Sequence, residues 1–301
     1  MTDGNKRRCA VIFNPVKVSD DFQEAMSRRL AAARWTDPIW LQTAEDDPGR
    51  SMAATAVEQQ VDLVVAAGGD GTVRIVADGL ANSGIPMGIV PSGTANLLAR
   101  NLGIPMTEDD AIDVALSGRT RTIDLIKLSV DGGEPEHFAV MAGMGIDAMI
   151  MDETNPELKD MIGTAAYFVA AAKALGRLPV PMRIRLDNRR PHRRRAMICV
   201  VGNVGGLLGN ITLIPGAQPD DGELDVYVAS PHRLTQWIRV FVRLITRRSN
   251  GQDRVDQWRG RRVEIRLDEP DTYQLDGDVV GELRRLVAEV QPQALSIRVP
   301  E

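Results

Sequence analysis

The sequence predicts an α/β domain in the N-terminal half of the chain and an antiparallel β domain in the C-terminal half. In the first half, apolar runs of strand length alternate with stretches of helix length, which is typical of a mostly parallel, Rossmann-like sheet with helices on both faces. From about Ile123, short alternating runs are separated by turn signals such as Asp131-Gly132-Gly133. We therefore expect domains over residues 1–123 and 124–301, with the final segment packing back on the first domain.

The first elements of the chain follow this alternation. Cys9–Phe13 is predicted to be a buried strand, and Asn14-Pro15 ends it because proline cannot continue inside a sheet. Helices are expected over Asp21–Ala33 and Ser51–Gln59, with a short strand at Ile39–Leu41 between them.

A glycine-rich turn dominates the first half. The apolar run Asp62–Ala67 leads into Gly68-Gly69-Asp70-Gly71-Thr72, and these glycines let the backbone approach a ligand without obstruction from a Cβ. Thr72 is the expected N-cap of the next helix, whose N-terminus would favour a phosphate. Asp70 would repel that phosphate unless a cation lies between them or its carboxylate holds a hydroxyl or water. Its removal is expected to abolish the chemistry and leave the fold intact, although a plain capping aspartate is the structural alternative.

A second turn repeats this arrangement. Gly88–Val90 is predicted to be a strand, followed by Pro91-Ser92-Gly93-Thr94 and a helix over Ala95–Leu102. Ligands of such folds bind at the carboxyl ends of parallel strands. Both turns are therefore expected to open onto one crevice.

In the second half, the predicted strands share alternating polarity and flanking turn residues. They are Ile123–Val130, Phe138–Ala142, Met182–Leu186, Ala196–Val201, Leu224–Ala229, Val263–Arg266 and Ala294–Val299. Two helical stretches, Asn155–Leu175 and Pro231–Arg248, interrupt them.

Composition excludes some classes of protein. The 36 basic and 41 acidic residues give a net charge of −5, which argues against a nucleic-acid partner. Cys9 and Cys199 have no metal-site spacing, so we expect free, buried thiols in a reducing compartment, by default the cytoplasm. The longest apolar tract, Met161–Ala172, is too short to span a bilayer, so any membrane contact would be peripheral and reversible.

The pair of glycine turns resembles the catalytic domain of the diacylglycerol kinase family, which includes bacterial lipid kinases and is related to sphingosine and ceramide kinases and, more distantly, to NAD kinases. Further motifs appear in the family's order. They are Asn14-Pro15, Thr43 with Pro48-Gly49, Ile123-Asp124-Leu125, Gly143-Met144-Gly145-Ile146-Asp147, Asp220-Asp221-Gly222-Glu223-Leu224-Asp225 and Asp276-Gly277-Asp278.

This resemblance implies a two-domain kinase, with a β-sandwich as the second domain and ATP in the cleft between the domains. The residues that would contact ATP come from the turns at the strand ends. They are Asn14, Thr43, Gly68, Gly69, Asp70, Gly71, Thr72, Val73, Arg74, Gly93 and Thr94.

The resemblance also implies a catalytic base in the Asp276-Gly277-Asp278 segment, where the family has Asp-Gly-Glu. Either Asp276 or Asp278 could accept the proton of a lipid hydroxyl, and Asp276 is favoured because its position matches without change. With Asp70, these residues are the candidate catalytic carboxylates. An ordinary Asp-Gly β-turn is the alternative interpretation.

Two acidic features complete the resemblance. Gln218, Asp221 and Glu223 would hold a structural Mg²⁺, although a turn without metal fits equally well. Asp124 would join Asp70 in an acidic network. Leu97 follows Asn96 where many bacterial lipid kinases carry an aspartate, which leaves the identity of the lipid open.

Basic residues are concentrated in two further segments. Arginines between Arg183 and Arg195 crowd a predicted hairpin, and Gln236–Arg248 is predicted to be an amphipathic helix. Both could contact an anionic membrane, or could simply be a solvated face and a packed helix. His137 and His232 have no ligand or triad partners at recognisable spacing and are interpreted as structural.

Together these observations predict a kinase that uses ATP and Mg²⁺ to phosphorylate a hydroxyl of diacylglycerol or a related lipid alcohol. The alternatives are a soluble NAD kinase-like enzyme and a non-catalytic lipid-binding or regulatory protein of the same fold. The sequence leaves open whether the chain forms a homo-oligomer.

Overall fold

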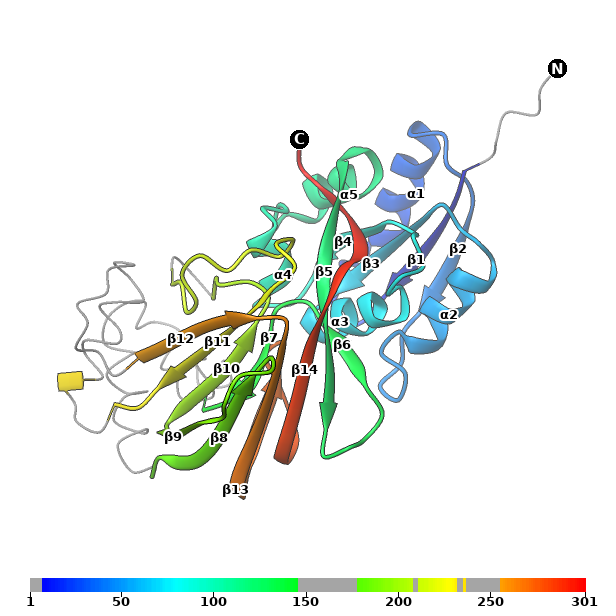
Figure 1. The fold of residues 1–301 in the computed structure, drawn as a ribbon. Coiled ribbons are helices and arrows are strands. Elements are labelled where there is room, and N and C mark those ends of the chain that lie inside the picture. Colours follow the sequence, from blue (N-terminus) through cyan, green and yellow to red (C-terminus); the bar gives the residue numbers. More distant parts are fainter. Residues whose placement is uncertain (1–6, 146–177, 208–210, 232–234, 237–254) are drawn as a thin grey trace.

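The computed structural model describes residues 7–145, 178–207, 211–231, 235–236 and 255–301 (Figure 1). The N-terminal elements alternate between strands and helices. They are β1 (Arg8–Phe13), α1 (Phe22–Ala32), β2 (Thr36–Gln42), α2 (Arg50–Glu58), β3 (Leu63–Gly68), α3 (Asp70–Gly79), β4 (Met87–Pro91), α4 (Leu97–Asn101) and α5 (Glu108–Ser117). The predicted α/β order is confirmed.

The four strands of this half lie parallel in the order β2-β1-β3-β4. Helix α1 packs with α5 and helix α2 with α3, and the two pairs cover opposite faces of the sheet (Figure 1). Strands β1 and β3 are almost entirely buried, because branched aliphatic residues fill both of their faces. Both glycine turns follow the carboxyl ends of neighbouring strands, β3 and β4.

The elements of the second half are strands. They are β5 (Arg119–Val130), β6 (Glu136–Phe138), β7 (Met141–Met144), β8 (Val180–Leu186), β9 (His192–Ala196), β10 (Ile198–Gly202), β11 (Leu224–Ala229), β12 (Val255–Gly260), β13 (Arg262–Leu275) and β14 (Asp278–Val299). Their pairings are antiparallel, which confirms the predicted β-sandwich class.

Strand β14 joins the two halves. Its first part pairs with β13, and its second part, from Leu286 to Val299, pairs with β5. Near its end, Ile297 lies opposite Met87 of β4 in parallel register. The chain thus returns to the N-terminal sheet, and the hydrophobic core there includes Leu295 and Ile297.

A second core fills the sandwich. Successive residues of β10 face different cores, since Val200 belongs to the N-terminal cluster while Cys199 and Val201 belong to the sandwich cluster. Both cysteines are buried and free, as expected.

Some expectations differ from the structure, and others fall outside it. Helix α3 begins at Asp70 with Gly69 as its N-cap, so Thr72 is a buried helical residue and the prediction that it caps the helix was wrong. The helix expected over Asn155–Leu175, most of Pro231–Arg248, His232, and Ile146 and Asp147 lie outside the described residues. Among the described helices, none has the length and apolarity needed to cross a bilayer.

Candidate active site

The two glycine turns are packed directly against each other. Gly68 lies opposite Pro91 in the sheet, and the Ser92 amide donates to the Gly68 carbonyl at 2.9 Å. A Cβ on Gly93 would come within 2.7 Å of the Gly69 Cα, so a larger residue would push the turns apart. This contact confirms that both turns open at one place, and it explains why glycine is required there.

Asp70 links the two turns through its carboxylate. Its oxygens accept hydrogen bonds from the amides of Asn96 and Leu97, at 2.7 and 2.6 Å, at the start of α4. Asn96 itself has a left-handed conformation (φ 47°) and bonds back to Gly93 through its side chain. Asp70 is therefore part of the framework of the site as well as a candidate catalytic residue. The effect of its removal on the chemistry and on the fold stays a prediction.

The hairpin between β13 and β14 brings a second carboxylate to the site. Asp276 and Gly277 form its turn with positive φ values of 49° and 103°. The Asp276 side chain is 4% exposed, and its Oδ1 accepts the amides of Val140 and Met141 at 3.2 and 2.8 Å. Burial raises the pKa of Asp276 to about 7, although the amides of Met141 and Ala139 and the charge of Arg74 act in the opposite direction.

Asp278 completes a group of three carboxylates. Its side chain is exposed, and a Cβ on Gly71 would lie 3.0 Å from its Oδ2, so Asp278 stands over the first turn of α3. Burial raises the pKa of Asp70, and the negative charge of Asp278 adds to that effect. The three candidate catalytic residues thus come together at the N-terminus of one helix.

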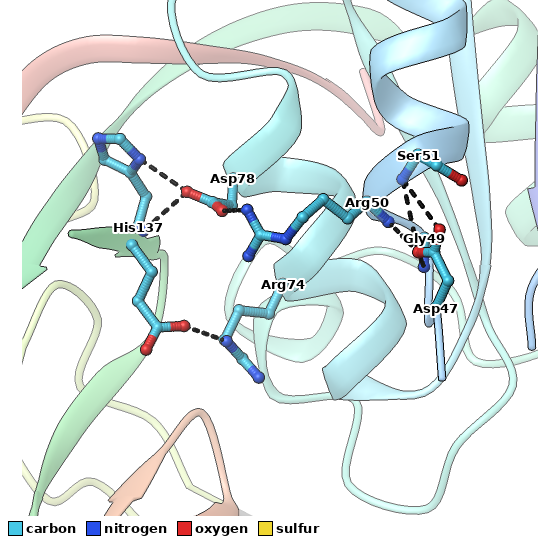
Figure 2. A network of polar contacts seen from close by, with 8 residues as sticks. Asp47, Gly49, Arg50, Ser51, Arg74, Asp78 and His137 are labelled. Carbon is cyan, nitrogen blue, oxygen red and sulfur yellow. Dashed lines mark hydrogen bonds and ion pairs between the residues drawn. The ribbon is translucent and has the colours of Figure 1, made fainter. Parts of the chain in front are cut away.

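A polar network ties α3 to β6 and to the start of α2 (Figure 2). Asp78 accepts from the backbone amide of His137, contacts its ring nitrogen at 2.8 Å, and pairs with Arg50 at 3.1 Å. Hydrogen bonds from His137 lower the pKa of Asp78 against the opposing effect of burial. Arg74, on the same helix, pairs with Glu136 at 2.8 Å.

Sequence reasoning missed Asp78 and Glu136, because neither belongs to a local motif. Asp78 and its partner His137 are 59 residues apart in the chain, and Glu136 and its partner Arg74 are 62 residues apart. Only the pairing of β6 with β5 places Glu136 and His137 beside α3. His137 contacts Asp78 through its backbone amide and its ring, and its interpretation as a structural residue stays a prediction.

The remaining residues predicted to contact ATP lie at the same edge of the sheet. Asn14 follows β1, and its amide donates to the carbonyl of Ala67 at 2.9 Å. Thr43 follows β2, is buried, and donates its amide to Phe13. Thr94 is exposed in the second turn. Contact of any of these residues with ATP stays a prediction.

The acidic turn after Pro219 lies apart from this group of carboxylates. Burial raises the pKa of Asp221, and the neighbouring Asp225 and Glu223 add to it, whereas Arg259 opposes it from 4.0 Å. The side chains of Gln218, Asp221 and Glu223 all offer oxygen atoms, and acidic residues predominate at this turn. Such ligands suit a hard cation such as Mg²⁺. Within the described part of the chain, no group of three or more His, Cys, Asp or Glu side chains has the arrangement of a metal site.

Asp124 belongs to this acidic turn by its hydrogen bonds. Its carboxylate accepts the amides of Gly222 and Gln293, both at 2.7 Å, and so ties the turn to β14. The hydrogen bonds of Asp70 go instead to the start of α4. The hydrogen bonding of Asp124 thus links β5, the acidic turn and β14 within the C-terminal half. A network of Asp124 with Asp70 stays a prediction.

Comparison with known proteins agrees with this geometry. Residues 8–128 match the diacylglycerol kinase catalytic domain, and residues 140–299 match the YegS C-terminal NAD kinase beta sandwich-like domain. A diacylglycerol kinase of Mycobacterium tuberculosis is 30% identical over 89% of this chain and 86% of its own length. A diacylglycerol kinase of Bacillus subtilis is 27% identical over 92% of this chain and 91% of its own length.

A solved structure shares the fold. The crystal structure of a diacylglycerol kinase from Bacillus anthracis str. Sterne superposes with a TM-score of 0.73 over 98% of this chain and 97% of that one, at 22% identity. The glycine turns, the carboxylates beside them and both matched domains lead to one assignment: the chain belongs to the diacylglycerol kinase family of lipid kinases.

Proposed function

We propose that this enzyme transfers the γ-phosphoryl group of ATP to a hydroxyl of diacylglycerol or a related lipid alcohol. The observation that carries the proposal is the gathering of Asp70, Asp276 and Asp278 at the N-terminus of α3, beside two glycine turns. Phosphoryl transfer needs chiefly positioning and charge stabilisation, and this arrangement supplies both.

The nucleotide would lie across the carboxyl ends of β1 to β4. Gly69 and Gly71 have no side chain of their own to keep a ligand from the backbone, whereas the Gly93 amide already donates to the Asn96 side chain at 3.0 Å. The positive end of the α3 dipole would attract phosphate. Asp278, with Asp70 behind it, would hold the Mg²⁺ that neutralises charge on the phosphates when bound. Arg74 would add positive charge from the same helix.

Asp276 is the proposed base. A base with a pKa near the working pH removes a proton efficiently, and burial raises the pKa of Asp276 to about 7. Its Oδ1 is occupied by two amides, whereas Oδ2 has only a long contact of 3.5 Å with the amide of Ala139. Oδ2 is therefore the atom that would accept the hydroxyl proton.

A structural Mg²⁺ at Gln218, Asp221 and Glu223 is the second part of the proposal. Burial raises the pKa of Asp221, and the negative charges of Asp225 and Glu223 add to that effect, so a cation at this turn would favour the ionised carboxylate. The turn is hydrogen-bonded to Asp124, which also accepts the amide of Gln293, so an ion there would stabilise the contact of the turn with β5 and β14.

Peripheral contact with the membrane is the third part. Arg183 and Arg193 lie opposite each other on β8 and β9, and both are exposed, as are Arg189 and Arg190 in the turn. Arg194 is different, because it pairs with Asp256 at 2.7 Å and stacks over Trp258. The exposed arginines would attract anionic lipids, each by roughly 1 kcal/mol.

The test is an assay of the full chain with radiolabelled ATP against vesicles carrying diacylglycerol, monoacylglycerol, ceramide or sphingosine, and against soluble NAD. Labelled lipid that depends on Mg²⁺ is the expected product. Labelled NADP would favour an NAD kinase-like enzyme, and the absence of any product would favour a non-catalytic lipid-binding protein. The Asp276→Asn variant serves as the matched control for contaminating kinases.

A further inference from the structure

The tip of the β13–β14 hairpin exposes apolar side chains beside the carboxylates. Within the described part of the chain, the exposed large apolar side chains are those of Val16, Leu178, Val279 and Val280. Val279 is 63% exposed and Val280 45% exposed, and the two directly follow Asp278. The hairpin thus places two apolar side chains in water next to the reacting groups.

A β-bulge accounts for the exposure of both neighbours. Gln274 lies opposite Val279 and Tyr273 opposite Gly281, so Val280 is an extra residue without a cross-strand partner. In a regular strand, successive side chains point to opposite faces, and one of them would usually meet the core. A bulge re-aims a side chain, and such bulges are common next to active sites.

The outer side of this tip is free of packing, whereas its inner side is fixed. A Cβ on Gly277 or Gly281 would meet nothing within 4 Å. On the partner strand, Tyr273 and Leu275 are buried in the sandwich core. The two valines are therefore held by a rigid base. Their exposure places apolar surface in water, which is unfavourable and which the packing of the fold does not require.

We infer that Val279 and Val280 form an apolar tip that enters the hydrocarbon edge of a lipid surface and brings the acceptor hydroxyl to the carboxylates. The inference rests on the proposed function, because a lipid hydroxyl must reach Asp276 while its acyl chains stay in the membrane. Apolar groups of peripheral proteins enter roughly 5–10 Å below the headgroups. Two residues of extended chain, at about 3.3 Å each, reach a depth within that range.

The occupant is lipid hydrocarbon and not a protein partner, on two grounds. The apolar surface consists of two valines, which is far smaller than a stable protein interface needs. In addition, the tip adjoins the carboxylates of Asp278 and Asp276, where a bound protein would cover the site but a lipid would present its hydroxyl.

A fluorescent label tests the inference without measuring activity. Cys9 and Cys199 are fully buried, and burial raises the pKa of both thiols to about 12, so a cysteine introduced at the surface reacts selectively. Val279→Cys, Val280→Cys and, as a control, Val16→Cys are each labelled with a polarity-sensitive dye. Vesicles contain phosphatidylcholine and phosphatidylglycerol, with or without diacylglycerol.

The expected result is a blue shift at positions 279 and 280 upon addition of vesicles, with quenching by lipids that carry a spin label on the acyl chain. The label at Val16, which is 87% exposed but lies outside the hairpin, keeps its spectrum in water. Labels at 279 and 280 that stay in water, or three labels that shift equally, would overturn the inference.

Kinetics provide the second measurement. Threonine keeps the β-branched shape of valine, so Val279→Thr with Val280→Thr preserves the strand. KM for diacylglycerol in vesicles is expected to rise about tenfold, with kcat and KM for ATP within about twofold of wild type. Val16→Thr is the matched control, and an unchanged KM in the double variant contradicts the inference.

The two proposals fail separately. If labelled lipid is formed but the labels at 279 and 280 show no blue shift, the apolar-tip inference is wrong and the proposed lipid kinase activity stands. If the labels show a blue shift but the protein phosphorylates no lipid, the tip is a membrane contact and the proposed function is wrong.

Discussion

Asp276 holds a carboxylate in surroundings that favour its protonated form. Burial opposes ionisation of the carboxyl group, whereas two backbone amides and Arg74 favour it. The effect of burial is the larger, so the pKa of Asp276 is raised. The folded protein therefore retains a proton that the unfolded chain releases from its ordinary pKa of 3.8 upward. Stability contributed by this group is complete below that value and is lost as the pH rises through about 7.

Asp276→Asn is expected to remove both the pH dependence and the catalysis. The side-chain oxygen of asparagine can accept the same bonds from Val140 and Met141, so the fold persists. In wild type, the free energy of unfolding falls by at most about 4 kcal/mol between pH 4 and 7, and this fall should be absent in the variant. Turnover should fall by roughly 10²–10⁴. Denaturant melts and initial rates at several pH values measure this, and a variant that keeps a rate profile rising near pH 7 would show that another group is the base.

Asp70 and Asp278 are expected to separate structure from chemistry. In Asp70→Asn, the side-chain NH₂ group replaces one of the two carboxylate oxygens that accept the amides of Asn96 and Leu97. One of these backbone amides then loses its acceptor, which lowers the free energy of unfolding by about 1–3 kcal/mol. Asp278→Asn changes an exposed side chain and should leave stability within about 0.5 kcal/mol. Both should lower turnover, and equal melting temperatures in the two variants would contradict the role of Asp70 as a link.

At the scale of single elements, the acidic turn makes the Mg²⁺ proposal measurable. Added Mg²⁺ is expected to raise the melting temperature of wild type, since a ligand that binds only the folded state stabilises it. Asp221→Asn should abolish that rise. Asp220→Asn is the matched control, because Asp220 pairs with Arg121 at 2.7 Å and is not a proposed ligand. If Mg²⁺ leaves the melting temperature of wild type unchanged, this turn holds no structural metal.

Elements specified by neighbouring residues could be predicted from the sequence, and those specified by distant ones could not. The strand before Gly68 and the turn after it are encoded locally, by branched aliphatic residues followed by glycines. Strand β12 (Val255–Gly260) is not among the predicted strands, and it pairs with β11, which ends at Ala229, much earlier in the chain. The length of β14 likewise depends on β5 and β4, which lie far away in the chain.

The same distinction applies to the site. Motifs placed Asp70, Asp276 and Asp278 as candidates, and the structure brings them together. Burial of Asp276, capping of α4 by Asp70 and the pairing of Arg74 with Glu136 are tertiary properties that no local pattern encodes. The choice between Asp276 and Asp278 as base depends on those surroundings, and for that reason the motif alone left it open.

At the scale of the whole molecule, a net charge of −5 opposes binding to an anionic membrane, so docking must depend on where positive charge is gathered. Arg190 and Arg193 are exposed at the β8–β9 hairpin, and within the described part of the chain neither forms an ion pair. We expect wild type to sediment with phosphatidylglycerol vesicles at low salt and to be released as the Debye length falls below about 10 Å.

Arg190→Gln with Arg193→Gln should weaken that sedimentation by roughly 2 kcal/mol in binding free energy, about 30-fold, and leave KM for ATP unchanged. Arg28→Gln with Arg34→Gln removes the same charge from exposed positions at the end of α1 and is the matched control. If both double variants lose binding equally, net charge alone governs docking. If neither loses it, the arginines of the hairpin are a solvated face, and the apolar tip at Val279 and Val280 would have to act without electrostatic help.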